Sequence, residues 1–247
     1  MTRVKICGLR DVETAVDAAK AGADMIGLVF AESRRKVTPQ ECFDVMTALH
    51  ELRGHEGAVQ FAGPGRGEVR GASWFGAWND AIEETLFRTR PLVVGVFADM
   101  TAEEVNNIAD AAKLDLVQLS GGEDDAFIDE IEWPVLRAIH VSDGMSAFDV
   151  QDAASPGHAR ALMLDTASAN ARGGTGEAFD HSVAAEVAER LPIMLAGGLD
   201  PDNVGEAVAA VEPWAVDVSS GVETDGQKDP AKVRAFVAAV KEADRGS

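Results

Sequence analysis

The chain has 247 residues, of which 42 are acidic and 22 basic, so its formal net charge is −20. Since nucleic-acid backbones are bound by basic surfaces, this balance argues against a nucleic-acid partner. No apolar run reaches the roughly 18 residues of a membrane-spanning helix, and two cysteines do not make a disulfide framework. We therefore expect a cytoplasmic protein without membrane contact.

The acidic residues are spread along the predicted helices and are not gathered into a tail. This distribution favours adaptation to high salt, where counterions screen the repulsion within a densely charged surface. The alternative is an ordinary acidic protein that its charge keeps soluble.

Short apolar runs alternate with longer amphipathic stretches along the whole chain, as in repeated βα units. In chain order, strands are predicted at 4–6, 25–30, 92–97, 116–119, 135–139, 161–164, 193–196 and 215–218. Helices are predicted at 11–21 with Gly22 as C-cap, from Thr38-Pro39, at 101–112 with a capping box, at 201–211 and at 229–243. Eight such units without a linker favour one (β/α)8 TIM barrel over 1–247 rather than an open doubly wound sheet.

The segment 53–90 interrupts this rhythm. It contains seven glycines, and Trp74, Trp78, Ile82 and Leu86 recur at the spacing of an amphipathic helix. An insertion after a helix and before a strand lies on the N-terminal face of a barrel, away from the chemistry. We expect a packing or subunit-contact element, or partial disorder, rather than a lid.

Two side chains that transfer protons stand where predicted strands end. Cys7 precedes Gly8 after the first strand, and Asp165 follows the sixth. Barrel enzymes place reactive groups at this C-terminal end, so Cys7 could act as a base or nucleophile and Asp165 as an acid or base. The alternatives are a small buried apolar cysteine and a structurally paired carboxylate. Cys42, inside a predicted helix, is expected to be structural.

A phosphate site is predicted after the last two strands. Gly197 and Gly198 follow the seventh strand, and Ser219, Ser220 and Gly221 follow the eighth. Loops at these places, with bare amides at a helix N-terminus, bind phosphate in many barrels. Arg35, in a basic patch at 33–36, could clamp a substrate anion. The glycine-rich loop 173–176 and a capping role for Asp180 are weaker signals.

Together these motifs resemble the phosphoribosylanthranilate isomerase family of tryptophan biosynthesis. The resemblance runs from end to end apart from 53–90, and it is carried above all by KICGL at 5–9, LMLDT at 162–166, LAGGLDPDNV at 195–204 and AVDVSSGVE at 215–223. It implies an Amadori rearrangement of N-(5-phosphoribosyl)anthranilate, the third step from chorismate, without metal or cofactor. By this resemblance Asp165 is the general acid and Cys7 the general base. Arg35 would pair with the anthranilate carboxylate, and the two loops would bind the phosphate.

Two positions depart from the family pattern, and two other functions are alternatives. Ser120 stands where relatives often carry histidine, and His181 where an aromatic residue is common, which bears on substrate packing or pH tuning. The first alternative is a histidine-pathway sugar-phosphate isomerase, which would be expected to use paired aspartates. The second is a catalytically silent barrel that only binds phosphometabolites. The oligomeric state, monomer or homodimer, stays open.

Overall fold

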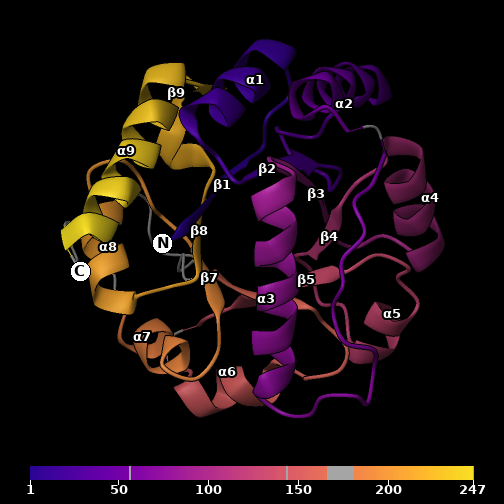
Figure 1. Cartoon of the computed structure of the whole chain (residues 1–247), viewed down its shortest axis with the longest axis vertical. Coiled ribbons are helices and arrows are strands. Elements are labelled where there is room, and N and C mark those ends of the chain that lie inside the picture. Colours follow the sequence, from indigo (N-terminus) through magenta and orange to yellow (C-terminus); the bar gives the residue numbers. More distant parts are fainter. Residues whose placement is uncertain (56, 143, 166–180, 247) are drawn as a thin grey trace.

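A computed structural model describes residues 1–55, 57–142, 144–165 and 181–246, and its eight parallel strands form a closed barrel (Figure 1). The barrel closes because β1 pairs with both β2 and β8. In order, the strands are β1 Arg3–Cys7, β2 Met25–Val29, β3 Leu92–Phe97, β4 Leu116–Leu119, β5 Val135–His140, β6 Ala161–Asp165, β7 Ile193–Ala196 and β8 Ala215–Val218. The predicted TIM barrel is confirmed.

Helices follow the strands around the outside of the barrel. They are α1 Val12–Ala21, α2 Pro39–Arg53, α4 Ala102–Ala112, α5 Asp125–Asp129, α6 Ala147–Ala153, α7 Ser182–Ala188, α8 Val204–Val211 and α9 Pro230–Gly246, with α3 Ser73–Arg88 as an addition. A 3₁₀ turn, Ser220–Val222, and a two-stranded hairpin, β9 Glu223–Thr224 and β10 Gln227–Lys228, follow β8. The capping box at Thr101, the cap at Thr38 before Pro39 and the left-handed Gly22 cap are present as predicted, and Thr38 also forms a capping box with Glu41.

One predicted helix start is wrong. The helix expected at 201–211 begins at Val204, because the carboxylate of Asp200 accepts the backbone N–H groups of Asp202 and Asn203 and shapes a turn there. The sequence alone does not distinguish this side-chain turn from a proline-led first helical turn, since both use Asp-Pro.

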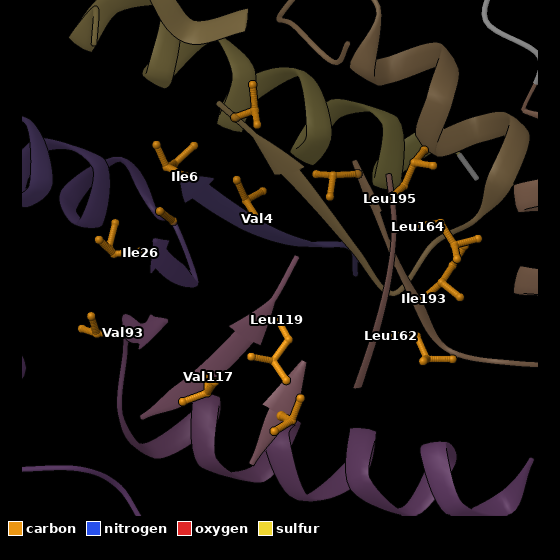
Figure 2. Close-up of a cluster of buried hydrophobic side chains, with 14 of the residues drawn as sticks. Val4, Ile6, Ile26, Val93, Val117, Leu119, Leu162, Leu164, Ile193 and Leu195 are labelled. Carbon is orange, nitrogen blue, oxygen red and sulfur yellow. The ribbon is translucent and has the colours of Figure 1, made fainter. Parts of the chain in front are cut away.

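Alternation along each strand divides the core in two. Side chains such as Val4, Ile6 and Leu164 lie between the strands and the helices (Figure 2). A second cluster fills the barrel; it includes Met25, Leu92, Val94, Leu116, Met163 and Met194. Both faces of the strands are therefore buried, as parallel barrels require.

Helix α3 crosses the N-terminal ends of the strands (Figure 1). Its Ile82 and Leu86 belong to the cluster inside the barrel. The indole Nε1 of Trp74 donates to the backbone oxygen of Ala159, just before β6, over 2.6 Å. Through Glu83 the helix also bonds Trp214, just before β8, over 2.8 Å. The insertion covers the end of the barrel opposite to Cys7.

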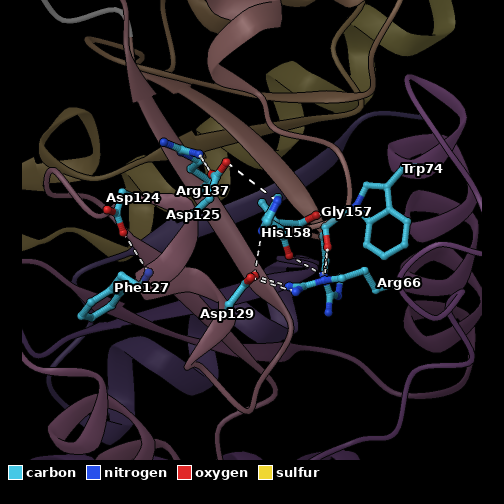
Figure 3. A network of polar contacts seen from close by, with 11 residues as sticks. Arg66, Trp74, Asp124, Asp125, Phe127, Asp129, Arg137, Gly157 and His158 are labelled. Atoms are coloured by element: carbon cyan, nitrogen blue, oxygen red, sulfur yellow. Dashed lines mark hydrogen bonds and ion pairs between the residues drawn. The ribbon is translucent and has the colours of Figure 1, made fainter.

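The segment before α3 is tied down by a polar network (Figure 3). Arg66 forms a bidentate ion pair with Asp129 of α5 and donates to the Gly157 carbonyl over 3.0 Å. His158 contacts the same carboxylate at 2.7 Å. These contacts connect the insertion to α5 and to the turn before β6. Of the helices in the part of the chain described, none is long and apolar enough to cross a membrane.

Candidate active site

Cys7 is the last residue of β1, and its thiol faces the inside of the barrel beside Val29 and Val96. The residue is 7% exposed. Gly8 then turns with φ +80°, a conformation that favours glycine. A Cβ there would lie 2.6 Å from Cδ of Arg35 and 3.4 Å from Oγ of Ser219. Because Gly8 has no side chain, three residues predicted for the site can come together at one corner of the barrel rim: Cys7, Arg35 and Ser219.

Asp165 is the last residue of β6, where it lies beside the last residue of β5, His140. His140 Nδ1 is 3.5 Å from Asp165 Oδ2, and its Nε2 is 3.0 Å from the backbone oxygen of Ser120. Because all eight strands are parallel, Asp165 and Cys7 share the C-terminal rim of the barrel. The strand β6 extends one residue beyond the predicted end, which makes Asp165 part of the wall.

The two loops predicted to bind phosphate contact each other. Gly197 and Gly198 have φ of +101° and +64°, so this stretch needs glycine. A Cβ at Gly221 would lie 1.9 Å from the backbone oxygen of Leu199, so the loop after β8 packs directly on the loop after β7. Ser220 opens the 3₁₀ turn of that second loop. The loop 173–176 and Asp180 lie outside the described residues.

Arg35 is held by a residue that the sequence did not single out. Its Nε and Nη2 donate to the two oxygens of Glu223, over 2.6 and 3.2 Å. Arg34 and Lys228 contact the same carboxylate at 2.6 and 3.1 Å. Burial alone would raise the pKa of Glu223, but Arg35 and Lys228 together lower it. These groups and Gly8 line a recess of about 250 Å³ with a cationic wall.

Charged and polar residues also stand inside the barrel below Cys7. Lys5 is fully buried, and its Nζ lies 2.7 Å from Oδ1 of Asp217 on β8. Gln118 of β4 donates to Ser120 Oγ over 2.9 Å, while its Oε1 has no hydrogen-bond partner among the described residues. The only sequence signal for Lys5 and Asp217 is a charge within an otherwise apolar strand.

The remaining candidates are structural or peripheral. Cys42 is buried in α2, and burial raises its pKa to about 11. His181 stands at the N-cap of α7. A larger apolar groove of about 650 Å³ lies between α2 and α4 on the outer wall and extends to the loops after β2 and β3. Within the described ranges, no three His, Cys, Asp or Glu side chains are placed to hold a metal ion.

Comparison with known proteins identifies the family. A family model described as N-(5'phosphoribosyl)anthranilate (PRA) isomerase matches residues 76–239. The N-(5'-phosphoribosyl)anthranilate isomerase of Dehalococcoides mccartyi is 37% identical, over 99% of this chain and 98% of its own length. A multifunctional tryptophan biosynthesis protein of Phycomyces blakesleeanus is 39% identical over 97% of this chain, which spans only 32% of that longer protein.

Solved structures agree. The phosphoribosyl anthranilate isomerase of Thermotoga maritima superposes with a TM-score of 0.72 at 28% identity, covering 98% of this chain and 100% of that one. A phosphoribosyl anthranilate isomerase solved in complex with reduced 1-(o-carboxyphenylamino)-1-deoxyribulose 5-phosphate superposes with a TM-score of 0.70 at 27% identity, with the same coverage. The chain belongs to the N-(5'-phosphoribosyl)anthranilate isomerase family.

Proposed function

We propose that this chain converts N-(5-phospho-β-D-ribosyl)anthranilate into 1-(2-carboxyphenylamino)-1-deoxy-D-ribulose 5-phosphate, in tryptophan biosynthesis. Membership of the isomerase family supports the reaction. The observation that carries the proposal is the common rim, where β1 ends in a thiol, β6 in a carboxyl group, and two glycine loops meet. A relative's complex with a reduced ligand of this kind supports a phosphorylated substrate.

In this proposal Asp165 acts as general acid and Cys7 as general base. Asp165 protonates the ring oxygen of the ribose, the ring opens, and the anthranilate nitrogen becomes an iminium ion. Cys7 then removes the proton from C2′, and the electron pair of that bond neutralises the iminium to give an enolamine. Tautomerisation of the enolamine gives the ketone. The substrate's own nitrogen accepts the electrons, so the chemistry calls for no cofactor.

The two ends of the substrate would be bound on opposite sides of the reacting carbon. Backbone amides around Gly197, Gly198, Ser219, Ser220 and Gly221 are proposed to bind the phosphate. Arg35 is proposed to bind the anthranilate carboxylate. Its guanidinium has five N–H donors, of which the bidentate pair with Glu223 takes two, so that three are left for a ligand as far as the described residues show. Fixing both ends places C2′ between Cys7 and Asp165.

The test follows the loss of anthranilate-type fluorescence from substrate generated in situ. Asp165→Asn is expected to be essentially inactive and Cys7→Ser severely impaired, because each removes a proton-transfer group. Cys42→Ala is the matched control, since its thiol is buried in α2. Unimpaired turnover by either rim variant would refute the mechanism.

We further propose a cytoplasmic enzyme, monomeric or homodimeric, that is adapted to high salt. A Thermotoga maritima relative is described as dimeric. The net charge of −20 supports salt adaptation, because like charges repel less when counterions screen them. Isomerase activity and unfolding should be measured against potassium chloride concentration. Full folding and activity at low ionic strength would contradict the salt adaptation.

A further inference from the structure

Lys5 is a buried cation inside the barrel, two residues before Cys7 on β1 and on the same face of the strand. Strand register places it directly beside Asp217 of β8. The side chain of Lys5 is 0% exposed, and Nζ lies 2.7 Å from Asp217 Oδ1. Taking an ion pair out of water costs free energy, and well-packed apolar residues of similar volume often stabilise a fold as well or better. The pair therefore calls for a reason other than stability.

A second buried pair in the same barrel shows what a structural ion pair looks like. Arg53 and Asp115 are both 0% exposed and lie 2.6 Å apart. Asp115 also accepts the backbone N–H groups of Val59 and Val93, and Arg53 also donates to the carbonyls of Pro91 and Gly57. By contrast, Asp217 Oδ1 is the one oxygen acceptor within the described ranges to which the Lys5 ammonium donates. Two of its three N–H donors are left to face another group.

That group is the sulfur of Cys7. Gly27 of β2 lies opposite both side chains, and a Cβ there would be 2.9 Å from Cys7 Sγ and 3.2 Å from Lys5 Nζ. Glycine thus leaves open the space on which the thiol and the ammonium converge. Strands β2 and β3 contribute Val29 and Val96 here, which carry no charge.

The charges around the sulfur oppose its burial. Burial is the largest influence and, with Asp217, leaves the pKa of Cys7 raised overall; the charge of Lys5, with a hydrogen bond from it, and the charge of Lys228 limit that rise. For Lys5, burial would lower the pKa, but Asp217 and Cys7 outweigh it and the net shift is upward. Lys5 therefore stays charged beside the thiol.

We propose that Lys5 is the counter-ion of the Cys7 thiolate, a positioning residue that Asp217 holds in place and keeps protonated. This inference rests on the proposed role of Cys7 as the base. When Cys7 removes the C2′ proton, sulfur becomes a neutral thiol and the electron pair goes to the iminium; Lys5 keeps its three protons throughout. Its task is to make the thiolate available before that step.

The chain is well suited to a direct titration of this thiol. It has two cysteines and no tyrosine, so in a Cys42→Ala background the alkaline ultraviolet band of a thiolate comes from Cys7 without a tyrosinate band. The spectrum of the matching Cys7→Ser/Cys42→Ala protein is subtracted at each pH. The midpoint is then compared with that of Lys5→Met in the same background.

Lys5→Met is expected to raise the midpoint of the Cys7 titration by about one pH unit. At any pH below the midpoint, the thiolate fraction then falls about tenfold. The acidic limb of the kcat/KM profile is expected to shift by the same amount. The double variant Lys5→Met/Asp217→Asn leaves no unpaired buried charge and should fold if the single variant does not. Its midpoint is expected above the parent but below Lys5→Met, because it also removes an opposing anion. Arg53→Met, a buried cation removed elsewhere, should lower stability without moving the midpoint.

A midpoint equal to that of the parent, in Lys5→Met or in the double variant, would overturn the inference. The titration needs no substrate, so its outcome is independent of the proposed function. If Cys7→Ser kept full isomerase activity, the role of Cys7 as base would fail even with the predicted titration shift.

Discussion

His140 and Asp165 end neighbouring strands, with Nδ1 of the imidazole 3.5 Å from Oδ2 of the carboxyl group. The other ring nitrogen, Nε2, lies 3.0 Å from the Ser120 carbonyl oxygen, which can only accept. Nε2 therefore carries the hydrogen, and in the neutral ring Nδ1 is an acceptor facing Asp165. An acceptor there can take a hydrogen bond from the carboxyl group that is proposed as the general acid, and can so orient it.

Replacing His140 with alanine is accordingly expected to reduce kcat by about tenfold, within the range for assisted proton transfer. Its side chain is 57% exposed, so stability should change little. Steady-state kinetics and urea unfolding test both statements. His55→Ala, at an exposed position near the end of α2, is the control. Wild-type kcat in His140→Ala would refute the role.

Gly221→Ala is expected to separate the two phosphate loops. The new methyl group would meet the Leu199 backbone oxygen at 1.9 Å, so one loop must move. We expect KM to rise at least about tenfold, which corresponds to the loss of a single good hydrogen bond to a charged group. The change in kcat is expected to be smaller.

Gly205→Ala provides the matched control for that substitution. Gly205 lies within α8, and a Cβ there would meet nothing within 4 Å. Because Gly205 stands in the first turn of the helix and its site has room, alanine there should not destabilise the protein and should leave KM unchanged. Equal KM values for the two variants would refute a phosphate site at the loop contact.

Glu223→Gln tests the anchor of Arg35. The carboxylate is 6% exposed and contacts Arg34, Arg35 and Lys228, so its removal leaves the buried charge of Lys228 uncompensated. We expect the free energy of unfolding to fall by about 3 kcal/mol at neutral pH. KM is expected to rise, because Arg35 is no longer fixed. Glu32→Gln, an exposed carboxylate paired with Lys36, should cost little.

The same residue should give stability a defined pH dependence. Although burial works in the other direction, Arg35 and Lys228 leave the pKa of Glu223 below its usual range. The folded protein thus releases this proton more readily than the unfolded chain. The stabilisation is full above the unfolded-state pKa of about 4.3 and is lost as pH falls through the lower folded-state value. Denaturation of wild type and Glu223→Gln across the acid range should show the two stabilities converging, and a constant difference would contradict this assignment.

Trp74→Ala separates stability from catalysis. The indole is fully buried, bonds Ala159 and stacks with Arg160, whose guanidinium carbon lies 5.0 Å from the ring centre. Its loss should cost about 3–5 kcal/mol, while kcat of the folded fraction stays at the wild-type value, because α3 covers the N-terminal end. Phe87→Ala on the same helix, at 87% exposure, should change neither quantity. A fall in kcat for Trp74→Ala would show coupling between α3 and the rim.

The alternation of apolar strands with capped helices was enough to predict the barrel, because burial on both faces of a strand and N-capping are local properties of the chain. The positions of Cys7, Asp165 and the glycine loops at the ends of strands were also predictable, because a strand ends where its apolar run stops. The start of α8 was misplaced because Asp200 could shape a turn or cap a helix, and only its actual acceptor contacts distinguish the two.

Only the closed barrel decided which side chains meet. Lys5 and Asp217 are 212 residues apart, and nothing local distinguishes them from other charges until β1 pairs with β8. Glu223 reaches Arg35, and His140 reaches Asp165, through contacts between separate βα units. The sequence by itself determined the fold and the two rim residues, whereas tertiary structure alone determined their electrostatic partners, because Coulomb energy depends on distance in space and not along the chain.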